Sequence, residues 1–209
     1  KYLERHKDLG IHSEMLSDSI MEIIASGAIS NRKKTFHPGK VVTSFCIGSR
    51  KLYDFVNNNP HIEFYPSSYV NKPTNIAKND NMIAINSALE VDLTGQVVAD
   101  SLGFDFYSGI GGQVDFVSGA SMSKGGKPII ALPSTAKNET VSRIVPYITE
   151  GSGVVTSRGN VHYIVTEYGI ASLRGKSIRE RALELIRVAQ YEILRQCVEL
   201  WVSNQLIIL

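Results

Sequence analysis

The sequence predicts an α/β fold in which a mixed sheet is flanked by helices. Short β-branched runs alternate along the chain with segments whose apolar residues recur at helical spacing. Two pairs of strand-like runs are joined by turn signals, and such hairpins add antiparallel pairs to the sheet. The 209 residues suffice for one large domain or roughly one and a half ordinary ones.

The first 80 residues predict alternating helices and strands. Ile20, Ile23 and Ile24 recur at helical spacing after Ser17, a favourable N-cap, and before Gly27, so a helix is expected over residues 18–25. The polar stretch over residues 31–40 is interpreted as a surface connection. The other elements expected here are a strand over 41–47, a helix capped by Ser49 that ends at 57–60, a strand over 62–65 and a short helix over 73–78.

The rest of the chain predicts two hairpins and a longer helix. Residues 82–92 and 96–100 are apolar runs joined by a Thr-Gly turn, which predicts the first hairpin. The other elements expected here are buried strands over 128–132 and 153–156, a strand over 161–166 that pairs back across the turn at 158–160, and an amphipathic helix over 177–189 with Arg and Glu on its polar face.

Composition and charge exclude several classes of protein. Hydrophobic residues make up 43% and charged residues 20%, which is typical of a folded soluble domain. The net charge of +2 is too small for a general nucleic-acid binder, and no run approaches the ~18 apolar residues of a membrane span. Cys46 and Cys197 lie far apart without zinc or disulfide spacing, so a cytoplasmic location is expected, or a mitochondrial one if the source is eukaryotic.

The start of the chain carries information of its own. The first residue is Lys1 rather than methionine, and residues 1–10 are too charged for a signal peptide. We therefore expect this chain to be part of a longer protein.

The first candidate for chemistry is Glu14, which precedes the helix predicted over residues 18–25. A carboxylate between a strand-like segment and a helix lies where open α/β sheets place reactive groups. The structural alternative is a charge that the helix dipole favours, and on these residues alone that alternative is the commoner case.

The glycines of residues 109–116 could hold an anion. Gly109, Gly111 and Gly112 leave backbone amides bare before Gln113, and a helix that begins soon after would add its positive end. The complete G-x-G-x-x-G spacing of dinucleotide sites is absent, so a nicotinamide site is poorly supported. A tight turn from strand to helix explains the glycines equally well.

A third stretch follows the strand predicted over residues 128–132. Ser134 and Thr135 offer hydroxyls there, and Lys137 offers a cation. On its own this signal is weak, because most lysines after strands are merely solvated.

Other polar residues allow bland interpretations. Glu90 and Asp92 share one side of a predicted strand, so they could form an acid/base pair, although such carboxylates more often form the wet face of a hairpin. Glu167 closes a strand and is expected to be structural. The five histidines show no ligand spacing, so no metal site is expected.

Seven segments follow one another in order: D-L-G-I-H-S-E-M-L-S-D, N-S-A-L-E-V-D-L-T-G-Q, G-I-G-G-Q-V-D-F, S-K-G-G-K-P-I-I-A-L-P-S-T-A-K, R-I-V-P, V-T-E-Y-G-I-A-S-L-R-G-K-S and R-E-R-A. Together they resemble the C-terminal half of the acetyl-CoA hydrolase/transferase family. The resemblance extends from about Asp8 to Ala189, and its nearest branch is the 4-hydroxybutyrate and butyrate:acetate CoA-transferases. Seven motifs in one order do not arise by chance.

The resemblance implies that this chain is the second of two similar α/β domains, with a CoA-transferase-like fold. Members of the family use a glutamate as covalent nucleophile in a segment like H-S-E, which matches Glu14. Glu90 is a rival because it also lies in a family-like segment. The reaction needs coenzyme A or an acyl-CoA as substrate, and it needs no metal.

The resemblance also implies contacts with CoA. The family's oxyanion and CoA-contacting glycine matches the pair Gly111 and Gly112, and a second CoA contact falls within residues 134–137, with Lys137 as the first choice. Further candidates for contacts with CoA or substrate are Gly109, Gln113, Ser134 and Glu90.

Two departures from the family pattern bear on the organisation of the chain. The glycine-rich CoA loop of the family would lie upstream of Lys1, so the N-terminal half of the family is an expected partner. Residues 190–209 do not resemble the usual ending, so the domain is expected over residues 1–189, followed by an atypical tail. A homo-oligomer is expected by analogy, with no nucleic-acid or membrane partner.

The activity implied by the resemblance is transfer of CoA between an acyl-CoA and a short-chain carboxylate of the acetate, butyrate or 4-hydroxybutyrate type, by a ping-pong route through a glutamyl-CoA thioester. One alternative is an acetyl-CoA hydrolase, in which water reaches that thioester. A second is a non-catalytic CoA-binding half that needs its N-terminal domain. A third is a nucleotide-binding protein that uses residues 109–112 for phosphate.

Overall fold

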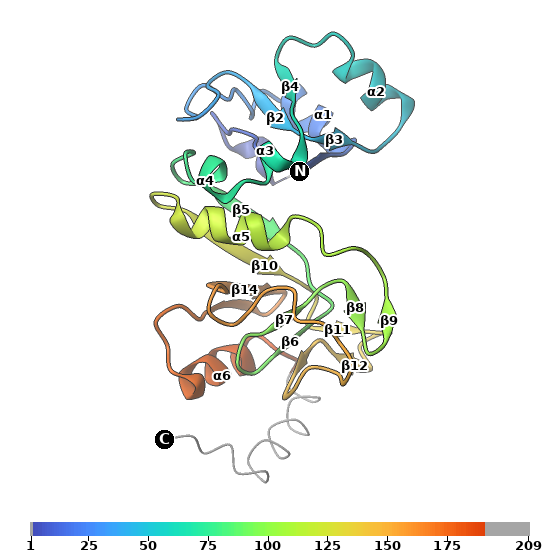
Figure 1. Cartoon of the computed structure of the whole chain (residues 1–209), viewed down its shortest axis with the longest axis vertical. Coiled ribbons are helices and arrows are strands. Elements are labelled where there is room, and N and C mark those ends of the chain that lie inside the picture. Colours follow the sequence, from blue (N-terminus) through green and yellow to red (C-terminus); the bar gives the residue numbers. More distant parts are fainter. Residues whose placement is uncertain (1, 191–209) are drawn as a thin grey trace. The chain divides into compact units, whose positions relative to one another are not determined.

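The structure, a computed structural model, describes residues 2–190 (Figure 1). The predicted α/β class is confirmed, because short strands and helices alternate along the chain. Two compact units are present: the first comprises residues up to 82 together with 122–126, and the second comprises residues 83–121 and those from 127 onward. The tail predicted over residues 190–209 lies outside the described residues from 191 onward.

The first unit is built on two parallel strand pairs. β1 (Met15–Leu16) pairs with β3 (Phe45–Cys46), and β2 (Val41–Thr43) pairs with β4 (Ile62–Phe64). Buried Leu16, Val41 and Ile62 form its centre, and apolar residues of two helices pack against them. The helical elements are η1 (Leu3–Arg5), α1 (Ser19–Ala25), α2 (Arg50–Val56), α3 (Ser67–Val70) and α4 (Pro73–Ile76).

Most elements predicted for this unit are confirmed, with two differences. The strand predicted over 41–47 is two strands, because the chain is interrupted at Ser44. Asp18 rather than Ser17 is the N-cap residue of α1. The Asp18 carboxylate accepts hydrogen bonds from the Ser49 amide (3.0 Å) and hydroxyl (2.7 Å), and so it ties the start of α1 to the start of α2.

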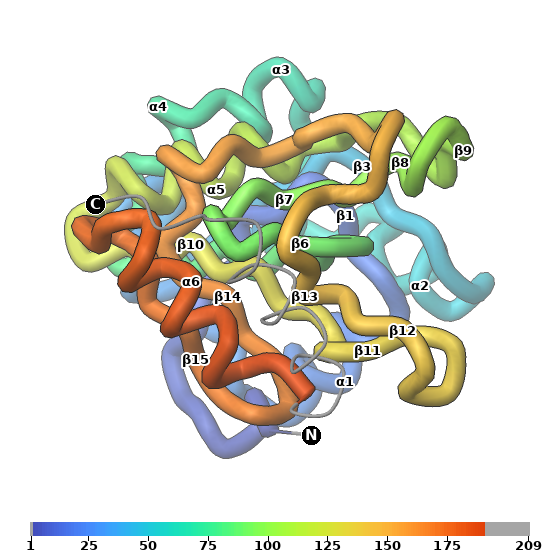
Figure 2. Tube along the Cα trace, turned by 90° about the horizontal axis from the view of Figure 1, so that it is seen from below, coloured from blue at the N-terminus to red at the C-terminus, as the bar shows by residue number. Residues whose placement is uncertain are grey.

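The second unit contains a four-stranded mixed sheet. Its strands lie in the order β15 (Gly169–Ser172), β14 (Tyr163–Thr166), β10 (Lys127–Ala131) and β5 (Ile83–Asn86). The last three are parallel to one another, and the edge strand β15 is antiparallel to β14. Figure 2 shows α6 (Ile178–Arg187) running beside β14 and β15. Apolar residues of α6 join one buried cluster with the sheet and with α5 (Gln113–Met122).

Smaller strand groups complete this unit. β6 (Glu90–Asp92) lies between β13 (Ile144–Val145) and β7 (Val97–Val98), while β8 (Ser101–Leu102) pairs with β9 (Asp105–Phe106) and β11 (Thr135–Ala136) pairs with β12 (Val141–Ser142). The longest helices within residues 2–190, α5 and α6, have ten residues each, fewer than the ~20 that cross a bilayer.

Two strand predictions for this unit are wrong. The run over 82–92 is not one strand: β5 joins the large sheet, and only β6 forms the expected turn with β7, where Gly95 adopts a φ of +90°. Residues 153–156 form a single bridge, from Thr156 to Val97, and β14 pairs with β10 and β15 rather than across 158–160. Apolar alternation predicts that a segment is a strand but not which strand it pairs with, because the pairing strand can come from a distant part of the sequence.

The last predicted helix is confirmed as α6, but the prediction that its arginines are exposed is wrong for one of them. Ser177 caps it in a capping box with Glu180, as the S-x-x-E spacing allows. Arg181, expected on the polar face, is 7% exposed, and its guanidinium donates to the carbonyls of Thr94, Leu173 and Arg158 at 2.7–2.9 Å. The arginine therefore joins three connections of this unit.

Candidate active site

Glu14 lies in the first unit, at an interruption shared by two strands. Ahead of it, His12 forms a parallel bridge with Val42, and after it β1 pairs with β3. The Glu14 carbonyl accepts hydrogen bonds from the amides of Ser44 (3.0 Å) and Phe45 (3.2 Å) and from the Thr43 hydroxyl (3.2 Å). The backbone at this carboxylate is therefore held by three donors.

The Glu14 side chain, unlike the Glu14 backbone, has no hydrogen-bonding partner within the described residues. The residue is half-buried, and within residues 2–190 its carboxylate makes neither a hydrogen bond nor an ion pair. A fixed backbone with an uncommitted carboxylate suits a group that must meet a ligand, because nothing within the described chain has to be displaced first.

His12, two residues before Glu14, is buried and 6% exposed. Its Nε2 lies 2.8 Å from the Val70 carbonyl, which makes that nitrogen the donor. Burial lowers the pKa of His12 to about 4, with smaller contributions from the charges of Lys34 and His37, although the Val70 hydrogen bond opposes the shift. The His12 ring is therefore neutral at physiological pH.

The glycine loop predicted from the sequence leads directly into α5. Gly111 adopts a φ of +60°, which a side chain would strain, and apart from the flanking residues no atom of residues 2–190 lies within 4 Å of the position that a Cβ would take at Gly109 or Gly111. The backbone at both glycines therefore faces open space, and the expectation of a helix soon after them is confirmed. Such a loop at a helix N-terminus presents amides to an anion.

Gln113, the first residue of α5, is fully engaged within the protein. Its Nε2 donates to the Ser87 carbonyl at 2.7 Å, and its Oε1 accepts from the Thr156 hydroxyl at 2.9 Å. Gln113 thus joins Ser87, just after β5, to Thr156, which lies in the connection before β14. This geometry favours a positioning role for Gln113 over a direct contact with substrate.

Ser134 and Glu167 meet at the carboxyl ends of β10 and β14. The Ser134 side chain is fully buried, and its hydroxyl (2.6 Å) and amide (2.9 Å) both donate to the Glu167 carboxylate. Burial alone would raise the pKa of Glu167, but hydrogen bonds from Ser134 and from its own backbone outweigh burial and lower it. The structural role expected for Glu167 agrees with these two hydrogen bonds, which we call the Ser134–Glu167 clasp. The Ser134 hydroxyl donates its proton within it.

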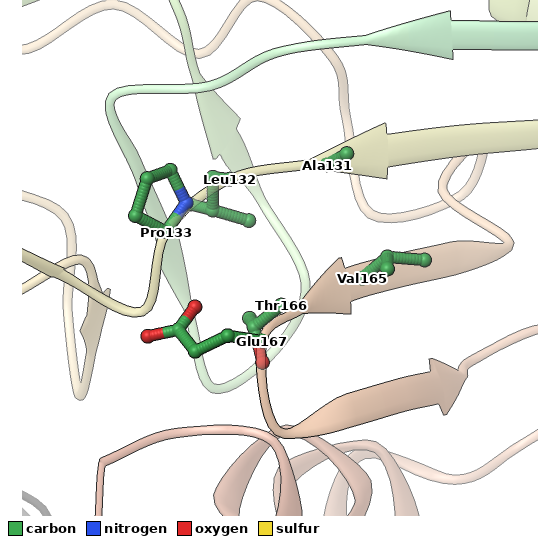
Figure 3. Close-up of a pocket in the computed structure, with 6 residues that line it drawn as sticks. All are labelled: Ala131, Leu132, Pro133, Val165, Thr166 and Glu167. Carbon is green, nitrogen blue, oxygen red and sulfur yellow. The ribbon is translucent and has the colours of Figure 1, made fainter. Parts of the chain in front are cut away.

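A shallow hollow lies beside this clasp (Figure 3). It has a volume of about 520 Å³ and is lined by Ala131, Leu132, Pro133, Val165, Thr166 and Glu167. Open α/β sheets bind ligands at this edge, outside the carboxyl ends of parallel strands. Lys137 lies beyond β11, exposed in the turn between β11 and β12, with a φ of +49°.

Glu90 and Asp92 are not the wet face of a hairpin. They are 4% and 3% exposed, and each has its own donors. Glu90 accepts from the Thr149 amide (2.6 Å) and hydroxyl (2.9 Å), whereas Asp92 accepts from the neighbouring Thr94 and Gln96. The two carboxylates therefore stabilise separate turns, and no hydrogen bond pairs them as an acid and a base.

The candidates fall into two groups. Glu14 belongs to the first unit, and the other predicted site residues belong to the second, where Gln113 and Ser134 hold connections at the carboxyl edge of the sheet. Within residues 2–190, no group of three His, Cys, Asp or Glu side chains is arranged to hold a metal ion. Asn31 and Lys34, whose side chains contact the segment before Glu14, were not predicted from the sequence as site residues.

Comparisons with known proteins identify relatives of this chain. Residues 48–196 match the acetyl-CoA hydrolase/transferase C-terminal domain. A 4-hydroxybutyrate coenzyme A transferase from Clostridium kluyveri is 57% identical over 188 residues, and a butyryl-CoA:acetate CoA-transferase from Anaerostipes caccae is 43% identical over 186. These alignments cover 90% and 88% of this chain but only 44% and 42% of the relatives.

A solved structure shares the fold as well. The crystal structure of RipA from Yersinia pestis matches 99% of this chain and 46% of its own, with a TM-score of 0.92 and 42% identity. The chain thus spans less than half the length of the relatives that it matches. The extent of the matched domain and these identities show that the chain belongs to the acetyl-CoA hydrolase/transferase family and contains its C-terminal domain.

Proposed function

We propose that the protein containing this chain transfers coenzyme A between an acyl-CoA and a short-chain carboxylate, with Glu14 as the covalent nucleophile. The substrate class follows the names of the relatives, a 4-hydroxybutyrate coenzyme A transferase and a butyryl-CoA:acetate CoA-transferase. The observation that carries the proposal is Glu14 itself: its carbonyl is held by three donors, while its carboxylate is uncommitted within the described residues.

The reaction proceeds by two exchanges at Glu14. The Glu14 carboxylate attacks the acyl-CoA carbonyl carbon, and the C–S bond breaks to give an acyl-glutamyl anhydride and the CoA thiolate. The thiolate then attacks the glutamyl carbonyl and expels the first acid as its carboxylate, which leaves a glutamyl-CoA thioester. The incoming carboxylate reverses these steps and leaves as the new acyl-CoA.

Each attack builds negative charge on a carbonyl oxygen. In this proposal the backbone amides of Gly111 and Gly112 donate to that oxygen, helped by the N-terminus of α5. The open space beside Gly109 and Gly111 supports this assignment, since an acyl group could approach the backbone there. Lys137, an exposed cation, is proposed to contact a phosphate of CoA.

The test compares Glu14→Gln with Glu90→Gln in the full-length protein, with acetyl-CoA and butyrate as substrates. We expect Glu14→Gln to abolish transfer, because an amide cannot act as the nucleophile, and to leave the affinity for CoA within about a few fold. Glu90→Gln is expected to lose activity only as far as it loses folded protein. An active Glu14→Gln together with an inactive, folded Glu90→Gln would reverse the assignment.

Omission of the acceptor acid distinguishes the two activities in the family name. A transferase holds CoA on Glu14 when no acceptor is present, and once a carboxylate arrives it releases that CoA as a new acyl-CoA rather than as free CoA. Continuous release of CoA from acetyl-CoA alone would instead identify a hydrolase. Binding of CoA without turnover in either assay would identify a non-catalytic CoA-binding protein.

A further inference from the structure

The stretch over residues 31–40 does more than join α1 to β2. It was predicted as a surface connection, and it contains neither helix nor strand. Asn31, however, is 5% exposed, and Lys34 is only partly exposed. Both side chains form hydrogen bonds with the backbone of Ile11, three residues before Glu14.

These bonds replace one step of a strand ladder. At the bridge between His12 and Val42, the Val42 amide donates to the Ile11 carbonyl at 3.2 Å and the Ser13 amide to the Val42 carbonyl at 3.0 Å. One step further back, a regular parallel ladder would pair the Ile11 amide with the Lys40 carbonyl. Instead, the Ile11 amide donates to Asn31 Oδ1 at 2.8 Å, and the Lys40 carbonyl accepts from Lys34 Nζ at 2.7 Å.

Lys34 bridges the two segments that no longer pair directly with each other. Its Nζ also donates to the Ile11 carbonyl at 2.8 Å, so a single ammonium binds the carbonyls of Ile11 and Lys40. The side chain reaches this place across Gly10, where a Cβ would overlap with Lys34 Cγ. Burial lowers the pKa of Lys34 to about 8, although the charge of Glu63 opposes the shift, as expected for an amine enclosed by protein.

We propose that Asn31 and Lys34 are positioning residues for Glu14. By replacing one step of the ladder with side-chain hydrogen bonds, they set the course of residues 11–14 and therefore the place of the carboxylate. The three donors on the Glu14 carbonyl hold the other end of the same segment. The inference rests on the proposed function, in which Glu14 is the nucleophile.

The test uses two neighbouring lysines in the full-length protein. Lys34→Met removes both hydrogen bonds, whereas Lys33→Met removes the same charge from an exposed lysine whose partner is Asp8. Since a shift of about 1 Å in a reacting group can cost about 10²-fold in rate, we expect kcat to fall by that order in Lys34→Met. The KM for acyl-CoA should stay within about threefold, and Lys33→Met should match the wild type.

A second variant displaces Lys34 without removing a polar group. Gly10→Ala should push the lysine aside and lower kcat to a similar degree. The same change in a Lys34→Ala background should add little, because the clash is with the lysine stem. Gly10→Ala in the otherwise wild-type protein, which keeps Lys34, decides the matter if Lys34→Met does not fold.

The outcomes separate this inference from the proposed function. A Lys34→Met enzyme with kcat within about twofold of the wild type, beside an inactive Glu14→Gln enzyme, would overturn only the positioning role. An active Glu14→Gln enzyme would overturn both. A rise in KM with unchanged kcat would show that Lys34 serves binding rather than the placement of the nucleophile.

Discussion

A buried histidine two residues before the proposed nucleophile is expected to make the first unit sensitive to acid. His12 is enclosed by protein, and its ring nitrogen Nε2 is engaged by the Val70 carbonyl. In the unfolded chain a histidine has its ordinary pKa of 6.5, whereas burial lowers the folded pKa of His12 to about 4. The unfolded state therefore binds more protons than the folded state between these two pH values.

The consequence is a loss of stability on acidification. As the pH falls from about 6.5 towards about 4, the contribution of His12 to the free energy of unfolding should decrease, by roughly 3 kcal/mol at most. Urea denaturation at pH 7 and pH 4 measures it, comparing the wild type with His12→Gln. His6→Gln, which changes an exposed histidine, is the control. Parallel pH curves for the wild type and His12→Gln would contradict the expectation.

Glu90 gives a prediction about stability rather than chemistry. Its carboxylate accepts both the amide and the hydroxyl of Thr149, and glutamine would turn a donor towards one of them. We expect Glu90→Gln to lower the free energy of unfolding by about 1–3 kcal/mol. Glu139→Gln, in the exposed turn after Lys137, is the matched control. Equal stability of the two variants would show that the contact with Thr149 contributes nothing.

The two candidate glutamates also show what sequence can and cannot resolve at a single residue. Glu14 precedes α1, as the order of elements predicts, but the strand β1 lies between them, so Glu14 is not directly before the helix as expected. The burial of Glu90 does not follow, because alternation says that Glu90 and Asp92 share a side but not that other segments cover it. Thr149 lies 59 residues away, beyond the reach of any local pattern.

At the scale of elements, local signals predicted the strands and helices better than their partners. β10 and α6 are almost as predicted, since a β-branched run after lysine and an S-x-x-E cap are local features. The division of residues 82–92 between two sheets is not local. Gln113 holds the Ser87 carbonyl at the point of division, and that contact exists only after α5 has packed. The roles of Asn31 and Lys34 could not be predicted for the same reason, because their hydrogen-bonding partner, the Ile11 backbone, lies in another segment.

Arg181 tests how strongly α6 is tied to the rest of its unit. Its guanidinium satisfies three carbonyls, and a Cβ at Gly95 would overlap with it, so the arginine fits closely against the turn between β6 and β7. Arg181→Met should lower the free energy of unfolding by on the order of 3 kcal/mol, because one buried and two partly buried hydrogen bonds lose their donor. Arg179→Met, which changes an exposed arginine of the same helix, should have little effect.

Thermal denaturation monitored by circular dichroism compares these two arginine variants. A larger loss for Arg181→Met supports the assignment of a structural arginine. Equal shifts for both variants would mean that the three hydrogen bonds are replaced by water at no cost.

At the scale of the whole molecule, each unit has its own buried cluster and its own share of the candidate residues. Glu14 with its supporting backbone belongs to the first unit, and the glycine loop with the carboxyl edge of the sheet belongs to the second. The relatives are more than twice as long as this chain. The acyl pocket is therefore best sought in the full-length protein, where all the segments that can line it are present.

The most direct test of the central claim is mass spectrometry of the full-length protein after incubation with acetyl-CoA. Quenching and digestion should yield one peptide that carries CoA, and fragmentation should place the adduct on Glu14. The adduct should disappear on addition of butyrate and should not form in Glu14→Gln. An adduct on a peptide containing Glu90, or a wild-type enzyme that turns over while its Glu14 peptide stays unmodified, would contradict the account.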